Sequence, residues 1–141
     1  MSTDQIAATA PTAATRRRAL TVTLWVAQVL FVALFLFAAL GKLTSDPNQV
    51  AGFAKIGAGQ WLRYATGVLE LAGAIGLLIP RLAGAAALGL VGIMVGAVGF
   101  HLTVAPPMGF AVIPAIVGTL LALIAYARRD EIKALVTSLR R

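Results

Sequence analysis

Long apolar stretches alternate with short polar connections along this chain. The apolar stretches cover residues 19–43, 61–79, 82–104 and 108–126. A helix of about 20 predominantly apolar residues is long enough to cross the hydrocarbon core of a bilayer. The pattern therefore predicts an all-α membrane protein built as a bundle of four transmembrane helices.

The first apolar stretch follows three arginines, Arg16–Arg18, an arrangement that signal peptides share. At 19–43 the stretch is longer than the apolar core of a signal peptide, which has about 7–15 residues, and further spans follow it. We therefore predict an uncleaved first helix. Residues 1–18 are expected to form a disordered basic tail, 19–127 the four-span membrane domain, and 128–141 a cytoplasmic amphipathic tail.

A short helix is expected between the first two spans. Ser45-Asp46-Pro47 is a helix-start signal with proline at the first helical position, and Gly57 and Gly59 end the apolar pattern that includes Phe53. A segment of this length cannot span a bilayer. It is predicted to lie at the membrane interface as a lid over the bundle.

Small residues in the third span fall on one face of a helix: Ala85, Gly89, Gly92, Gly96 and Gly99. Such a face allows close helix approach, and we predict that it packs against a neighbouring helix. The only histidine, His101, lies about 140° away from Gly96, so it is expected to face a second neighbour or the outer interface. In the fourth span Pro114 predicts a kink.

Apolar residues at i, i+3, i+4 and i+7 predict an amphipathic surface helix in the C-terminal tail: Ile132, Leu135, Val136 and Leu139. Four spans put both termini on one side, with nine basic residues: Arg16–Arg18, Arg81, Arg128, Arg129, Lys133, Arg140 and Arg141. Lys42, Lys55 and Arg63 lie on the other side. This charge bias predicts an inner (plasma) membrane protein with cytoplasmic termini.

Composition narrows the classes of function. The net charge is +7 and 60% of the residues are hydrophobic, which fits contact with anionic lipids of the bilayer and not with nucleic acid. The chain has no cysteine and one histidine, so it is predicted to hold no disulfide, no thiol redox centre and no metal site within one chain. No nucleophile motif or phosphate loop is present, so an enzyme acting through its own residues alone is not expected. Whether the chain forms a homo-oligomer stays open.

The second span carries one carboxylate, Glu70, and the topology places Lys42, His101 and Arg63 toward the same end of the membrane. A charge at bilayer depth costs several kcal/mol, so it needs a partner or a proton. Gln28 shares a helix face with Lys42, about 21 Å away. The five candidates for ligand binding or proton relay are Lys42, Glu70, His101, Gln28 and Arg63. A structural polar network is the competing interpretation, in which Gln28 bonds a neighbouring helix and Lys42 reaches the headgroups.

Several segments together resemble the DoxX and DoxX-like family of small four-helix bacterial membrane proteins, over about residues 25–127. They are Phe37–Leu43, Phe53, Gly67–Pro80, Met94–Ala97 and Phe100–Leu102. The resemblance implies that Lys42, Glu70 and His101 occupy the polar positions of the family. It also implies a link to membrane oxidoreductases, such as a subunit of a thiosulfate:quinone oxidoreductase and complexes in thiol stress defence, and more distantly to receptor-assembly chaperones.

The resemblance favours an accessory or anchoring subunit of a membrane oxidoreductase system, with membrane redox proteins as partners. Because the chain lacks cysteine, a redox role would use a quinone or a partner's centre. Two alternatives stay open. One is a small proton-coupled transporter that uses Glu70, and the other is a non-catalytic assembly factor that binds partners through the third-span glycines and the tail.

Overall fold

The computed structural model describes residues 12–104 and 108–140, and all its regular elements are helices. They are α1 (Ala13–Leu43), α2 (Pro47–Ala54), α3 (Trp61–Leu78), α4 (Ala83–Thr103), the 3₁₀ turn η2 (Met108–Ala111), α5 (Val112–Ala127) and α6 (Arg129–Leu139). The all-α class is confirmed. The predicted tail is wrong for residues 13–18, which form the first turns of α1 behind the N-cap Thr12. Its residues 1–11 lie outside the described part.

Three segments are long and apolar enough to cross a membrane: Ala13–Leu43, Ala83–Thr103 and Gly109–Ala127. The second predicted span, α3, is not among them, and its 18 residues include Arg63 and Glu70. Both charged side chains are buried, whereas Val68, Leu69 and Ile75 of the same helix are exposed. The surface that α3 turns outward is therefore apolar.

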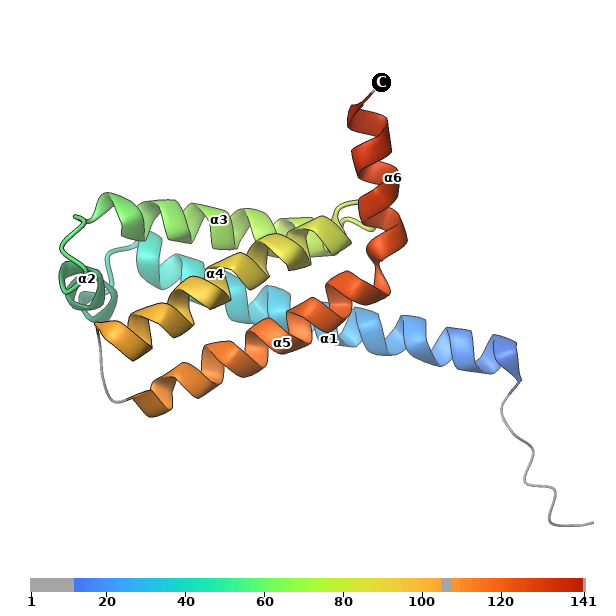
Figure 1. Ribbon diagram of the computed structural model, residues 1–141, viewed down its shortest axis with the longest axis horizontal. Helices are drawn as coiled ribbons and strands as arrows, with labels where there is room; N and C mark the ends of the chain where they lie inside the picture. Colours follow the sequence, from blue (N-terminus) through green and yellow to red (C-terminus); the bar gives the residue numbers. More distant parts are fainter. Residues whose placement is uncertain (1–11, 105–107, 141) are drawn as a thin grey trace, which may run out of the picture.

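Two helix pairs form the bundle, α1 with α3 and α4 with α5 (Figure 1). The pairs meet through α3 and α4 at the end where α6 lies, and α3 and α4 diverge toward α2 at the other end. The buried apolar core occupies the α6 end: Val32, Phe35, Ala74, Leu77, Ala87, Leu90, Leu121, Ile124 and Ala125. The start of α1 and α6 lie at the same end of the bundle.

Two glycines of α3 set its close approach to α4. A Cβ on Gly73 would lie 2.5 Å from Leu90 Cδ2, and one on Gly76 would lie 2.8 Å from Ala86 Cβ. Real Cβ atoms do not come so close, so larger residues would force the helices apart. The absence of these side chains lets α3 and α4 pack closely at the α6 end of the bundle.

The small-residue face of α4 does not pack as predicted. A Cβ on Gly89, Gly92, Gly96 or Gly99 would meet no atom within 4 Å. The helix instead buries its other side, which carries Ala83, Gly84, Ala87 and Leu90. Spacing identified the glycine face correctly, but spacing alone does not say whether a neighbour covers it.

Pro114 begins a helix and does not kink one, which corrects the prediction. It is the third residue of α5, and the irregular backbone falls before it as the turn η2. A proline in the first helical turn removes an N–H that has no intrahelical partner. It therefore costs no backbone hydrogen bond at this position.

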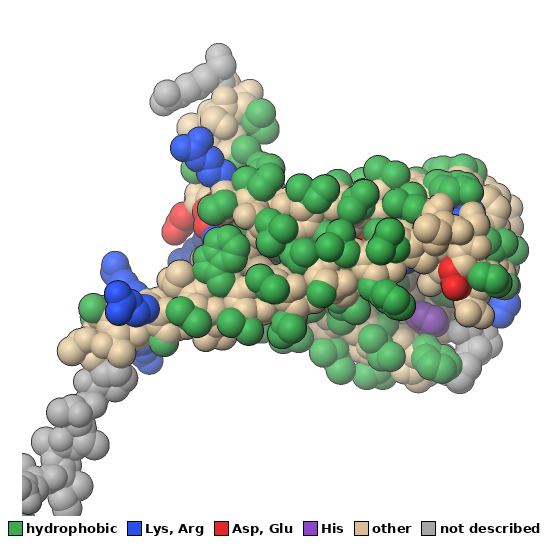
Figure 2. All heavy atoms as spheres, turned by 180° about the vertical axis from the view of Figure 1, so that it is seen from behind, with side chains coloured by type: hydrophobic (Ala, Val, Ile, Leu, Met, Phe, Trp, Pro, Cys, Tyr) green, Lys and Arg blue, Asp and Glu red, His purple; other side chains and the backbone are tan. Residues whose placement is uncertain are grey.

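Hydrophobic side chains cover the long sides of the bundle, while lysines, arginines and acids gather toward its two ends (Figure 2). The exposed apolar residues come from every long helix, such as Leu34, Val68, Val95 and Leu123. An apolar surface of this extent is typical of a protein surrounded by lipid.

The predicted C-terminal helix is present as α6 and lies across the bundle axis (Figure 1). Its start is fixed to the bundle, because Ile132 Cγ1 and Arg128 O would lie 2.8 and 2.9 Å from a Cβ on Gly84. Val136 and Leu139 farther along are exposed. In Figure 2 the hydrophobic side chains of this helix face the bundle side, as an interfacial helix requires.

Candidate functional site

A buried ion pair joins α1 to α3. Lys42 Nζ lies 3.1 Å from Glu70 Oε1, to which it donates a hydrogen bond, and 2.9 Å from Oε2. The two side chains are 11% and 4% exposed. Glu70 thus has the partner that a buried carboxylate needs, and the pair is neutral overall.

A missing side chain on α3 makes this pair possible. Gly67 lies one turn before Glu70 on the same helix face, and a Cβ on it would be 3.0 Å from Lys42 Cβ and 3.1 Å from Leu43 Cγ. Such distances are tighter than ordinary van der Waals contact. Glycine at this position therefore lets the end of α1 lie against α3 with Lys42 beside the carboxylate.

Arg63 hydrogen-bonds the backbone at the end of α1 that carries Lys42. Its Nη1 donates to the backbone carbonyl of Lys42, its Nε donates to Gln60 Oε1 at 2.7 Å, and its Nη2 donates to Ser45 Oγ at 3.2 Å. The last carbonyls of a helix have no intrahelical partner, so the guanidinium satisfies one of them at the end of α1. Arg63 is 2% exposed and does not line the cavity described next, so it holds the helix end in place.

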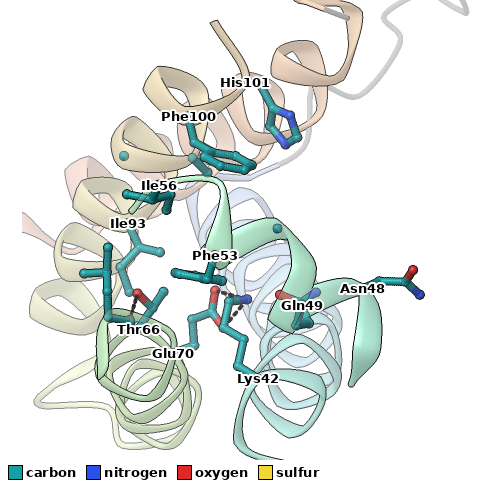
Figure 3. Close-up of a pocket in the computed structure, with 14 residues that line it drawn as sticks. Lys42, Asn48, Gln49, Phe53, Ile56, Thr66, Glu70, Ile93, Phe100 and His101 are labelled. Carbon is teal, nitrogen blue, oxygen red and sulfur yellow. Dashed lines mark hydrogen bonds and ion pairs between the residues drawn. The ribbon is translucent and has the colours of Figure 1, made fainter. Parts of the chain in front are cut away.

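A cavity of about 480 Å³ lies between the diverging helix pairs, with the ion pair on its wall (Figure 3). Helix α2 covers it, which confirms the predicted lid, and Phe53 from this helix lies next to Lys42 and Glu70. The lining residues are Lys42, Asn48, Gln49, Gly52, Phe53, Ile56, Leu62, Thr66, Glu70, Ile93, Gly96, Ala97, Phe100 and His101. Apart from the ion pair and a few polar groups, the wall is aliphatic and aromatic.

His101 lines the same cavity but does not join the ion pair. Figure 3 places it beyond Phe100, on the far side of Phe53 from Glu70. Its ring lies 5.3 Å from the Phe100 ring and 6.1 Å from the Phe110 ring, between centroids. Its Nδ1 is buried and has no hydrogen-bond partner among the described residues. An unpaired buried nitrogen is costly, so this one is suited to bond a molecule in the cavity.

Gln28 lies halfway along α1, at the α6 end of the bundle, and has no part in the cavity. Its Nε2 donates to Leu77 O at 2.5 Å, and its Oε1 accepts from Arg128 Nε at 2.9 Å and Nη2 at 2.6 Å. The predicted bond to a neighbouring helix is confirmed. Arg128 also bonds Glu131 Oε1 at 2.6 Å, so the network fastens α6 to α1 and α3.

The structure thus brings three of the five predicted residues around one cavity. Sequence reasoning missed Asn48 and Gln49, which line the cavity from α2, and Arg128 as the partner of Gln28. The helix-start signal at Asp46-Pro47 locates α2, but it does not show which of its sides faces inward. Within residues 12–104 and 108–140, no three His, Asp or Glu side chains lie together as metal ligands would.

The sequence profile of the DoxX-like family matches residues 26–125, which include the C-terminal part of α1, all of α3 and α4, and every residue that lines the cavity. The chain belongs to the DoxX-like family. Comparison with curated proteins and with solved structures found no match. Together with its three long apolar helices, the family makes this DoxX-like chain a membrane protein.

Proposed function

We propose that this DoxX-like protein is an accessory or anchoring subunit of a membrane oxidoreductase system, and that its cavity holds the headgroup of a quinone. One observation carries the proposal. The Lys42–Glu70 ion pair lies on the wall of a cavity of about 480 Å³ that is otherwise mainly apolar. Ligand sites are commonly such concave apolar spaces with a few convergent polar groups.

The residues of the cavity fit a small planar ring with polar oxygens. Lys42 can donate to a carbonyl oxygen, and Phe53 and Phe100 offer faces for the ring. His101 Nδ1 has no hydrogen-bond partner among the described residues, so a polar atom of the ligand could supply one. A bound quinone would supply the electron-transfer chemistry, while the side chains would bind it, orient it and exchange protons with it.

We further propose that α3 is the fourth membrane span and that both termini are cytoplasmic. Burial of Arg63 and Glu70 and the apolar outer surface of α3 support the span, because lipid would then contact no charged side chain of this helix. The charge bias supports the orientation, because Arg81, Arg128 and Arg129 lie at the end that carries α6. The cavity would then open toward the outer half of the membrane.

The ion pair favours a quinone subunit over a proton-coupled transporter. A carboxylate that exchanges protons with a cationic substrate must lose one partner to gain the other. Glu70 is instead held 2.9 Å from a buried ammonium on a neighbouring helix. A fixed pair of this kind is better suited to orient a neutral polar headgroup.

The experiment is equilibrium binding of a decyl-substituted benzoquinone to the purified protein in lipid nanodiscs. The double variant Lys42→Met/Glu70→Gln removes both charges, so it leaves neither one unpaired. We expect it to stay folded and to lose binding by at least about tenfold. The matched control is Glu131→Gln, a carboxylate paired with Arg128 outside the cavity, and its affinity should equal that of the unaltered chain. Equal affinities of all three proteins would refute the proposal.

A further inference from the structure

A second hollow adjoins the cavity along the boundary between α3 and α4. It measures about 190 Å³ and is lined by Leu69, Gly73, Ala86, Gly89, Leu90 and Ile93. Ile93 also lines the cavity that holds the ion pair, so the two spaces share a wall. The hollow lies on the inner side of the cavity, toward the core.

The unpacked glycine face of α4 connects the two spaces. Gly96 lines the cavity, Gly89 lines the second hollow, and Gly92 lies one turn from each on the exposed face between them. The distance from Gly96 to Gly89 along the helix is about 10 Å. A Cβ at Gly89, Gly92 or Gly96 would meet no atom within 4 Å, so the α4 surface between the cavity and the second hollow is open. We refer to this open strip and the second hollow together as the α3–α4 groove.

The chemistry changes along this groove. At the end that adjoins the cavity, the charged groups are Lys42 and Glu70, whose ion pair lies on the cavity wall. Toward the inner end, the side chains of the second hollow are hydrocarbon only, and the glycines add backbone. Water finds no hydrogen-bond partner among hydrocarbon side chains, whereas a methylene chain makes close dispersion contacts with them.

We infer that the ligand of this site is an amphiphile with one long hydrocarbon chain. Its polar head lies in the cavity beside Lys42 and Glu70, and its chain lies along Gly96, Gly92 and Gly89 toward the second hollow. This inference rests on the proposed ligand-binding function and adds the class of ligand. It also gives Gly89, Gly92 and Gly96 of α4 a role that helix packing within the chain does not.

A comparable hollow on the other side of α4 serves as the control. It measures about 310 Å³, lies between α4 and α5, includes Ala115 and Met94, and shares no residue with the cavity. An ordinary membrane lipid can fill either hollow. Only the α3–α4 groove continues to the ion pair, so only that groove can be occupied by the chain of a ligand whose head is bound there.

The test compares two probes in nanodiscs, the decyl-substituted benzoquinone and the same benzoquinone without its decyl chain. The variants are Gly89→Leu and Gly92→Leu, which fill the groove, and Ala115→Leu, which fills the control hollow. We expect the groove variants to lower the affinity for the decyl probe about tenfold relative to the unaltered chain, through lost chain contacts. Affinity for the chain-free probe should stay the same, and Ala115→Leu should change neither.

The outcomes separate the two claims. If neither probe binds the unaltered protein, the proposed quinone function fails. If both probes bind and the groove variants affect them equally or not at all, the function stands and the single-chain inference is overturned. If Ala115→Leu weakens the decyl probe as much as Gly89→Leu, the chain lies in ordinary lipid contact and the inference is likewise overturned.

Discussion

Lys42 and Glu70 meet across two helices, with Nζ 2.9 Å from Oε2, at a place where α3 carries no side chain on Gly67. The missing side chain on Gly67 therefore lets the end of α1 lie against α3, and the cation and the acid that meet there form part of the polar wall of the cavity. Because both charges are buried, neither is tolerable without the other.

The effect of removing one charge of the pair on protein stability depends on whether the other charge is present. Lys42→Ala leaves the Glu70 carboxylate buried without a partner, so we expect it to lower the free energy of unfolding by about 3–5 kcal/mol. The double variant Lys42→Met/Glu70→Gln should lower the free energy of unfolding by clearly less, because it leaves no buried charge unpaired. Thermal unfolding of the detergent-solubilised proteins measures both. A double variant no more stable than the single one would contradict the account.

The helices and the site differ in how far the sequence predicts them. Apolar runs of the right length locate α1, α4 and α5, and helix periodicity puts Gln28, Phe35 and Lys42 on one buried face, as observed. Local start signals locate α2, because the Asp46 side chain caps its first turn through the backbone N–H groups of Asn48 and Gln49.

The sequence alone does not show which helix faces contact each other. The third-span glycines share a face by spacing, but the chain turns that face outward because the α3–α4 contact is made by Gly73 and Gly76 against Leu90 and Ala86. Likewise the pairing of Gln28 with Arg128 joins residues 100 apart in the chain. Periodicity describes one helix at a time, so it cannot rank such distant partners.

Adding bulk at Gly67 should separate α1 from α3. Gly67→Val places atoms against Lys42 and Leu43, and overpacking of this kind typically costs about 1–3 kcal/mol. We expect a lower midpoint of thermal unfolding and weaker quinone binding. Gly99→Val is the matched control, since a Cβ there meets nothing within 4 Å. The same loss of stability in both variants would show that Gly67 has no special role in packing.

Loss of the hydrogen bonds between Gln28 and Arg128 should loosen the attachment of α6 to the bundle. Gln28→Leu removes the acceptor of two Arg128 hydrogen bonds, and bonds to a charged group contribute about 1.5–3 kcal/mol. We expect hydrogen exchange of the α6 amides to become about tenfold faster or more, with the α3–α4 core unchanged. In the control Thr119→Val, the lost hydroxyl bonds only Ala115 O of its own helix, and α6 should exchange normally. Unaltered exchange of α6 in Gln28→Leu would contradict the assigned role of Gln28.

The absence of cysteine makes the topology directly measurable. The variants Lys55→Cys and Ser138→Cys each introduce a single cysteine. The first lies between α2 and α3 and the second lies in α6, at opposite ends of the bundle. We expect a membrane-impermeant thiol reagent to label the first on intact spheroplasts and the second only after the membrane is opened. Labelling of both, or of Ser138→Cys alone, before the membrane is opened would overturn the four-span orientation.

If the Lys42–Glu70 cavity holds a lipophilic molecule with a polar head, mass spectrometry of what co-purifies in mild detergent will detect it. We expect a quinone in organic extracts of the unaltered protein and of Glu131→Gln. In Lys42→Met/Glu70→Gln, which lacks the ion pair on the cavity wall, we expect at least about tenfold less quinone. The same trace amount of quinone in all three preparations would contradict this expectation.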